Sequence, residues 1–234
     1  MPVARAKKPP NVDDSQTIPK AKSKQKMLVV AFGDSLTSGY QPPGSSSPLP
    51  KSTPYTDHLK NVIDEALEKA NKIKLIDVIF YNKGVSGELT SDMLRRLEGD
   101  VLSVKPNYVI ILGGSNDIGW SVEPTDILDN LIQMYEKSAS ANIEVVACTV
   151  PSVIGPESFV KPRLELNELI VDYCFENELV CVDLFSPTAD PKTKMLDKRY
   201  SSDGLHLNTA GYTKMAEIIF NQAFAKLIPV WTIV

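Results

Sequence analysis

The chain lacks the sequence features of several classes of protein. None of its apolar runs approaches the roughly 18 residues that cross a bilayer as a helix, and its N-terminus shows no apolar signal segment. It has no Gly-x-x-x-x-Gly-Lys-[Ser/Thr] phosphate loop. With only two histidines, far apart, and three scattered cysteines, it offers no zinc-ligand pattern. We therefore expect no membrane span, no P-loop nucleotide site, no metal and no organic cofactor.

Cysteine is scarce, and the number is odd. Cys148, Cys174 and Cys181 cannot all pair with one another, and two of them fall in predicted strands. We interpret them as small buried hydrophobic residues of a protein that works in a reducing compartment. The sequence therefore predicts a cytoplasmic location.

Charge is unevenly distributed along the chain of 234 residues, whose net charge is −4. Residues 1–26 hold seven basic side chains against two acidic ones, a net charge of +5, so the remaining chain carries −9. An acidic body argues against a nucleic-acid groove in the folded domain. The basic head has proline and no apolar periodicity, which is typical of a disordered tail. Its length and 43% hydrophobic composition fit one domain, over residues 27–228.

Apolar runs alternate strictly with amphipathic segments. The runs that indicate strands are Met27–Phe32, Leu75–Tyr81, Asn107–Leu112, Ile143–Val150 and Leu179–Phe185. Helical spacing begins near Pro54 and recurs over Met93–Val101, Ile127–Tyr135, Leu164–Cys174 and Thr209–Leu227. This alternation predicts a parallel sheet covered by helices on both faces, a three-layer α/β/α domain. The apolar end, residues 229–234, packs on the body or on a partner subunit, which leaves a homo-oligomer open.

The first strand leads into a Gly-Asp-Ser turn, and open parallel sheets bind ligands at the carboxyl ends of their strands. Ser35 is therefore a candidate nucleophile, although a serine after a strand is often only a helix cap. A nucleophilic serine needs a general base. His206 follows Asp203 by three residues, so that the carboxylate can orient the imidazole. His58, beside Asp57 on a polar helix stripe, is expected at the surface.

Acyl transfer also needs hydrogen-bond donors for the oxyanion. The candidates are the backbone N–H of Ser35, the backbone N–H of Gly87 and the side chain of Asn116. Gly87 can equally be a turn glycine and Asn116 a turn or cap residue. Asp34 and Asp117 either orient the neighbouring catalytic groups or cap turns. Residues expected to line the pocket, because their loops meet at the same sheet edge, are Tyr40, Trp120, Ile154 and Phe159.

Four short blocks carry a family resemblance. Gly33–Leu36, Asn82–Gly87, Gly114–Asp117 and Asp203–His206 are similar, in this order, to the blocks of the SGNH (GDSL-type) hydrolases. The resemblance implies a flavodoxin-like five-stranded sheet of order 2-1-3-4-5. It also implies Ser35 as nucleophile, His206 as base, Asp203 as its partner, and Ser35, Gly87 and Asn116 as the oxyanion hole. Ser115 and Leu207 depart from the residues common at their positions, but neither is a reacting group.

The resemblance implies hydrolysis of carboxylic esters through an acyl-serine intermediate. The residues after Ser35 are closer to the arylesterase, thioesterase and lysophospholipase branch, which favours short-to-medium acyl esters, with thioesters open. A carbohydrate acetylesterase is the alternative enzyme. A non-catalytic binding module and an FMN-binding flavodoxin are alternatives of other classes. The α/β-hydrolase fold is disfavoured because no glycine stands two residues after Ser35.

Overall fold

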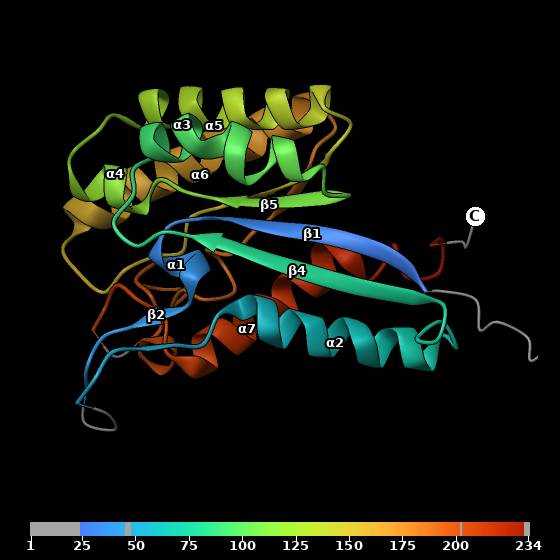
Figure 1. Cartoon of the computed structure of the whole chain (residues 1–234). Helices are drawn as coiled ribbons and strands as arrows, with labels where there is room; N and C mark the ends of the chain where they lie inside the picture. The colour runs from blue at the N-terminus through green and yellow to red at the C-terminus, as the bar shows by residue number, and fades with distance from the viewer. Residues whose placement is uncertain (1–23, 45–47, 202, 232–234) are drawn as a thin grey trace, which may run out of the picture.

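The computed structural model of the chain describes residues 24–44, 48–201 and 203–231, so most of the predicted basic tail lies outside the described residues. Its centre is a five-stranded parallel sheet (Figure 1). The strands are β1 (Gln25–Gly33), β4 (Ile76–Gly84), β5 (Tyr108–Leu112), β6 (Glu144–Cys148) and β7 (Val180–Val182). They are ordered β4-β1-β5-β6-β7. If the five strands of this sheet alone are numbered in chain order, the order is 2-1-3-4-5, which confirms the predicted topology.

Helices cover both faces of the sheet (Figure 1). On one side lie α2 (Tyr55–Lys69) and α7 (Thr209–Ile219); on the other lie α3 (Thr90–Asp100), α5 (Pro124–Ser140) and α6 (Glu157–Glu176). Successive side chains of β1 point to opposite faces of the sheet. Val29 and Ala31 lie in the hydrophobic core on one face, Val30 and Phe32 lie in the core on the other face, and all four are 0% exposed. A strand covered on both faces is an unbroken apolar run, which is why β1 is recognisable in the sequence.

Short elements surround the carboxyl ends of the strands. They are α1 (Ser35–Ser38), α4 (Ser115–Gly119) and the antiparallel pair β2 (Tyr40–Gln41) and β3 (Lys51–Ser52). One-turn helices elsewhere are η1 (Leu102–Val104), η2 (Lys198–Tyr200) and the π-helical η3 (Phe220–Phe224). Residues 41–50 are rich in proline, glycine and serine, which predicts a loop, but this segment begins inside the two-residue ladder. The ladder follows α1 directly and holds the chain near Ser35.

Several predicted boundaries were wrong; β7, for example, ends at Val182 rather than at Phe185. β4 continues through Asn82–Gly84, beyond the predicted end of this strand at Tyr81, because these residues complete the parallel pairing of β1 up to Gly33 opposite Gly84. α6 starts at Glu157 rather than Leu164 and keeps Pro162 inside it, with buried Val160 and Leu166 on either side. α7 ends at Ile219 and passes into η3 instead of running regularly to Leu227.

The C-terminal segment packs on the body of its own chain as far as it is described. Trp231 is 8% exposed and its Nε1 donates to the hydroxyl of Tyr108 at 3.2 Å. Lys72 Nζ donates to the carbonyl oxygens of Ile228, Pro229 and Trp231 at 2.6–3.0 Å. Trp231 thus packs on the body of its own chain, while Val230 is 64% exposed; residues 232–234 lie outside the described part.

The three cysteines are free, with Cys148 and Cys174 buried and Cys181 partly exposed. Within the described ranges, no helix is long and apolar enough to cross a membrane. In the same part of the chain, no three His, Cys, Asp or Glu side chains gather as metal ligands would.

Candidate active site

Ser35 is the first residue of α1, directly after β1, as the Gly-Asp-Ser turn predicts. Its side chain is nearly buried, with 6% of the residue exposed. Asp34 caps the short helix, and its Oδ1 accepts from the N–H of Leu36 at 2.8 Å. The Tyr212 hydroxyl donates to the carbonyl oxygens of Ser35 (3.4 Å) and Tyr40 (2.9 Å). These contacts from α7 and α1 hold the Ser35 turn at the sheet edge.

Asp203 and His206 form the pair that their spacing predicts. Asp203 Oδ2 lies 2.7 Å from His206 Nδ1, while Oδ1 accepts from the N–H groups of Leu205 (2.9 Å) and His206 (2.8 Å). Burial raises the pKa of Asp203, but the hydrogen bonds from the His206 ring and these two N–H groups outweigh it and hold the pKa below its usual value. An ionised Asp203 keeps the proton of the neutral imidazole on Nδ1, so Nε2 is free to accept one.

Ser35 and His206 reach the same region of the molecule. The ring of Tyr40 packs edge-on against that of His206, with centroids 4.8 Å apart, and Tyr212 contacts Ser35. Burial raises the pKa of Tyr212, and the negative charges of Asp34 and Asp203 add to the rise. Among the described residues no hydrogen bond joins the Ser35 hydroxyl to His206. Such catalytic bonds are often long without substrate and shorten when it binds.

The two other predicted oxyanion donors come from neighbouring loops. Asn116 lies in α4, just after β5, and its Nδ2 donates to the backbone oxygen of Glu88 at 2.9 Å. Gly87, the residue before Glu88, has a φ of +86° and no atom within 4 Å of the position a Cβ would take. Asp117 accepts from Thr90 N–H (3.0 and 3.1 Å) and Thr90 Oγ1 (2.6 Å). The structure therefore joins α4 to the Gly87 loop and to the start of α3.

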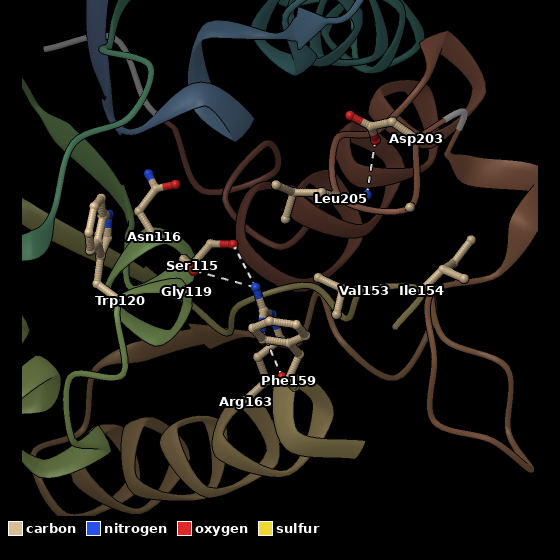
Figure 2. Close-up of a pocket in the computed structure, with 11 residues that line it drawn as sticks. Ser115, Asn116, Gly119, Trp120, Val153, Ile154, Phe159, Arg163, Asp203 and Leu205 are labelled. Atoms are coloured by element: carbon tan, nitrogen blue, oxygen red, sulfur yellow. Dashed lines mark hydrogen bonds between the residues drawn. The ribbon is translucent and has the colours of Figure 1, made fainter. Parts of the chain in front are cut away.

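A cavity of about 350 Å³ opens beside these groups (Figure 2). Asn116 lines it on one side and the Asp203–Leu205 segment on the other, and its wall is mainly apolar. The wall residues are Ser115, Asn116, Gly119, Trp120, Val153, Ile154, Phe159, Arg163, Asp203, Gly204 and Leu205. Three of the predicted wall residues are among them; Tyr40 instead lies against His206. His58 lies on α2, partly buried, with its Nδ1 3.5 Å from Thr213 Oγ1.

The sequence analysis missed Arg163. It is 2% exposed in the cavity wall, where Nη1 donates to the Phe159 oxygen (2.8 Å) and Nη2 to Ser115 Oγ (3.1 Å) and O (3.4 Å) (Figure 2). Its position three and seven residues before the buried Leu166 and Ile170 places it on the apolar side of α6. An arginine at that spacing is the signal that would have found it.

Asp34 and Arg163 are buried groups whose pKa values depend on each other. Burial raises the pKa of Asp34 to about 7, and Asp117 adds to the rise, whereas Leu36 N–H and Arg163 oppose it. Burial lowers the pKa of Arg163 to about 10, and Asp34 opposes that change. Asp34 Oδ2 and Arg163 Nε have no hydrogen-bond partner in the described part of the chain. The Ser35 turn thus contains a carboxyl group whose pKa lies near neutral pH.

We expect this carboxyl group to make folding stability depend on pH. Between the unfolded pKa of 3.8 and the folded value of about 7, the native state binds the proton that the unfolded state has lost, so stability falls as pH rises. The difference corresponds to about 4 kcal/mol. Relative to Asp34→Asn, the wild-type free energy of unfolding should fall by about that amount from pH 4 to pH 8 in urea titrations. Parallel pH profiles of the two proteins would contradict this assignment.

Comparisons with known proteins agree with this geometry. A model of the GDSL-like lipase/acylhydrolase family matches residues 31–214. The lipoprotein YqeF of Bacillus subtilis is 31% identical over 134 residues, covering 54% of this chain and 50% of that protein. The arylesterase of Vibrio mimicus is 31% identical over 137 residues, 58% of this chain and 60% of that protein. The match thus spans about half of each curated relative.

An acetylxylan esterase from Geobacillus stearothermophilus has a similar structure. It superposes with a TM-score of 0.68 at 20% identity, over 84% of this chain and 93% of that one. At this identity the likeness shows a shared fold. The family match is broader evidence, because it runs from before the Ser35 turn to beyond the Asp203–His206 pair. The chain therefore belongs to the GDSL-like lipase/acylhydrolase family.

Proposed function

We propose that the chain is a serine esterase that hydrolyses carboxylic esters with short-to-medium acyl groups. The observation that carries the proposal is the apolar cavity bounded by Asn116 and the Asp203–Leu205 segment, next to the 2.7 Å Asp203–His206 contact. Its volume of about 350 Å³ is at the small end of ligand pockets, about 300–1,000 Å³. This size favours short and medium acyl groups over long lipid chains.

In the proposed mechanism, His206 Nε2 takes the proton of the Ser35 hydroxyl as Oγ bonds to the ester carbonyl carbon. The oxyanion accepts hydrogen bonds from Ser35 N–H, Gly87 N–H and Asn116 Nδ2. The carbon–oxygen bond to the alcohol then breaks, and the alcohol leaves with the proton from His206. Water attacks the acyl-serine in the same way, with His206 first taking its proton and then returning one to Ser35. A thioester follows the same course with a thiol as leaving group.

A carbohydrate acetylesterase is the second candidate. Trp120 stands at the cavity with 77% of its surface exposed, and exposed aromatic rings offer an apolar face to a ligand. The acetylxylan esterase of similar fold also supports this alternative. Initial rates on nitrophenyl acetate, nitrophenyl octanoate and acetylated xylan separate the two: the first proposal expects faster hydrolysis of the octanoate than of the xylan acetate.

The cavity itself is tested by filling it. Gly119 lines the cavity, and a Cβ there would meet no atom within 4 Å, so the backbone leaves room for the Cβ of Gly119→Leu. We expect kcat/KM for nitrophenyl octanoate to fall about 10–200-fold relative to the acetate, the value of one or two methylene contacts. The control is Gly99→Leu, an equally open helical glycine in α3. An unchanged acyl preference in Gly119→Leu would show that the acyl group binds elsewhere.

A fluorophosphonate separates the enzyme from a non-catalytic binding module. The proposal requires stoichiometric labelling of Ser35, identified by peptide mass spectrometry, whereas a binding module leaves Ser35 unmodified. The absorbance spectrum of the purified protein distinguishes the esterase from an FMN-binding flavodoxin, because a colourless protein holds no flavin.

We also propose that the protein works in a reducing compartment and that the chain can form a homo-oligomer. We infer a reducing compartment from the free cysteines, although the Bacillus subtilis relative is a lipoprotein. Fractionation of cells that express the full-length protein tests the location. Sedimentation of the purified chain tests the homo-oligomer.

A further inference from the structure

We propose that Arg96, which lies outside the cavity, is a positioning residue that holds the oxyanion-hole loop against the nucleophile turn. The inference rests on the proposed esterase function and adds to it a residue that touches neither the substrate nor the reacting atoms. Arg96 comes from α3, and its side chain is 18% exposed.

The guanidinium of Arg96 spans both segments. Nε donates to the two carboxylate oxygens of Glu88 at 2.9 and 2.7 Å, and Nη2 lies 2.6 Å from Glu88 Oε2. Nη2 also donates to the backbone oxygen of Gly33 at 3.0 Å. Nη1 donates to Asp100 at 3.0 Å, and the guanidinium lies 4.3 Å from the centroid of the Phe32 ring. Only the planar, multidentate arginine side chain can make this set of contacts; lysine cannot.

Two of these contacts, to Gly33 and to Glu88, lie close in the chain to proposed catalytic groups. Gly33 is separated from Ser35 only by Asp34. Glu88 follows Gly87, and the Glu88 backbone oxygen accepts from Asn116 Nδ2 at 2.9 Å. This last hydrogen bond uses one of the two amide hydrogens of Asn116 and sets the direction of the other. The position of Glu88 therefore affects both Gly87 N–H and Asn116 Nδ2.

The start of the loop is held without Arg96, because Val85 N–H donates to the Gly33 oxygen at 2.9 Å and Ser86 Oγ lies 3.3 Å from Ser38 Oγ. The part of the loop that carries Gly87 and Glu88 has fewer contacts. Val85 is 43% exposed, and nothing lies within 4 Å of a Cβ position at Gly87. The hydrogen bond from Glu88 N–H to the Val85 oxygen is long, at 3.4 Å. By contrast, the Glu88 side chain is 17% exposed and is held by Arg96. Oxyanion donors act only when they are aimed at the developing charge. Loss of the Arg96–Glu88 contact should therefore reduce stabilisation of the transition state more than it reduces binding of the substrate.

The test compares Arg96→Met, Arg96→Lys and Glu88→Gln with the matched control Arg95→Met. Arg95 is the adjacent arginine of α3; its side chain is 73% exposed and forms an ion pair with Asp92. On nitrophenyl butanoate we expect kcat of Arg96→Met to fall about 10–100-fold, less than the roughly 10²–10³-fold for removing one oxyanion donor outright. KM should change less than about threefold, and Arg96→Lys should recover only part of the loss.

A second readout separates positioning from general stability. A trifluoromethyl ketone forms an oxyanion on Ser35, so its inhibition constant should rise in Arg96→Met by the same factor by which kcat falls. If Arg96→Met does not fold, Arg96→Lys and Glu88→Gln make the same comparison. Unchanged kcat in folded variants, or equal changes in kcat and KM without weaker ketone binding, overturns the role of Arg96 and leaves the esterase intact. A wild-type protein that neither hydrolyses esters nor reacts with a fluorophosphonate overturns both proposals.

Discussion

Replacing Ser35 by alanine is expected to lower kcat on nitrophenyl butanoate by about 10⁶-fold, the loss that follows removal of a serine nucleophile. Ser35 opens α1 directly beyond β1, and its backbone oxygen is held by Tyr212. Alanine keeps the backbone N–H and the cap from Asp34, so the turn should survive the change. The acyl-serine then cannot form, and only the residual effect of binding and the oxyanion hole remains.

The measurement is the steady-state rate together with the melting temperature. Ser103→Ala is the control, because Ser103 is an exposed serine whose hydroxyl donates to the Gly99 oxygen in α3. It should leave both values unchanged, and Ser35→Ala should leave the melting temperature within a few degrees. If Ser35→Ala kept more than about a tenth of the wild-type rate, Ser35 would not be the nucleophile and the proposed mechanism would be wrong.

The layers of the fold were predictable because they depend on local patterns, whereas the strand order was predicted from the family resemblance. β1, β5 and β6 are buried on both faces and are therefore continuous apolar runs. The ends of elements were less predictable because partners decide them. Asn82–Gly84 are polar, yet they extend β4 because Ala31–Gly33 of β1 offer paired backbone groups. Likewise Pro162 predicts a helix break, whereas the packing of α6 keeps the helix continuous around it.

The candidate site was predictable where its groups come from short motifs. Asp203 and His206 lie within one turn, so their spacing alone brings carboxylate and imidazole together, and their 2.7 Å contact agrees with that prediction. The distant contacts of Arg96 and Arg163 could not be found in this way, although helical spacing places Arg163 on the buried side of α6. Arg96 donates to the backbone oxygen of Gly33, 63 positions away, and Arg163 to that of Ser115, 48 positions away. Sequence spacing carries no information on contacts of that range.

Replacing Asp203 by asparagine is expected to lower kcat by about 10³–10⁴-fold with little change in KM, the effect of holding a catalytic imidazole in the wrong tautomer. The introduced amide would keep an Oδ1 that accepts from Leu205 and His206 N–H, as Asp203 does at 2.9 and 2.8 Å. The amide Nδ2 would take the place of the carboxylate Oδ2, 2.7 Å from His206 Nδ1. A donor there requires Nδ1 to accept, so the ring proton moves to Nε2, and Nε2 can no longer take the proton of Ser35.

Asp190→Asn is the matched control for this substitution. Asp190 accepts backbone N–H groups from Lys192 (3.0 Å) and Thr193 (2.8 Å), in a turn of the same kind with no histidine. The kcat of this control should equal that of the wild type. Because Asp203 acts through His206 on Ser35, the double variant Ser35→Ala/Asp203→Asn should be no slower than Ser35→Ala alone. Additive losses would mean that Asp203 contributes by a route independent of the nucleophile, and the geometry of the Asp203–His206 pair would then need another explanation.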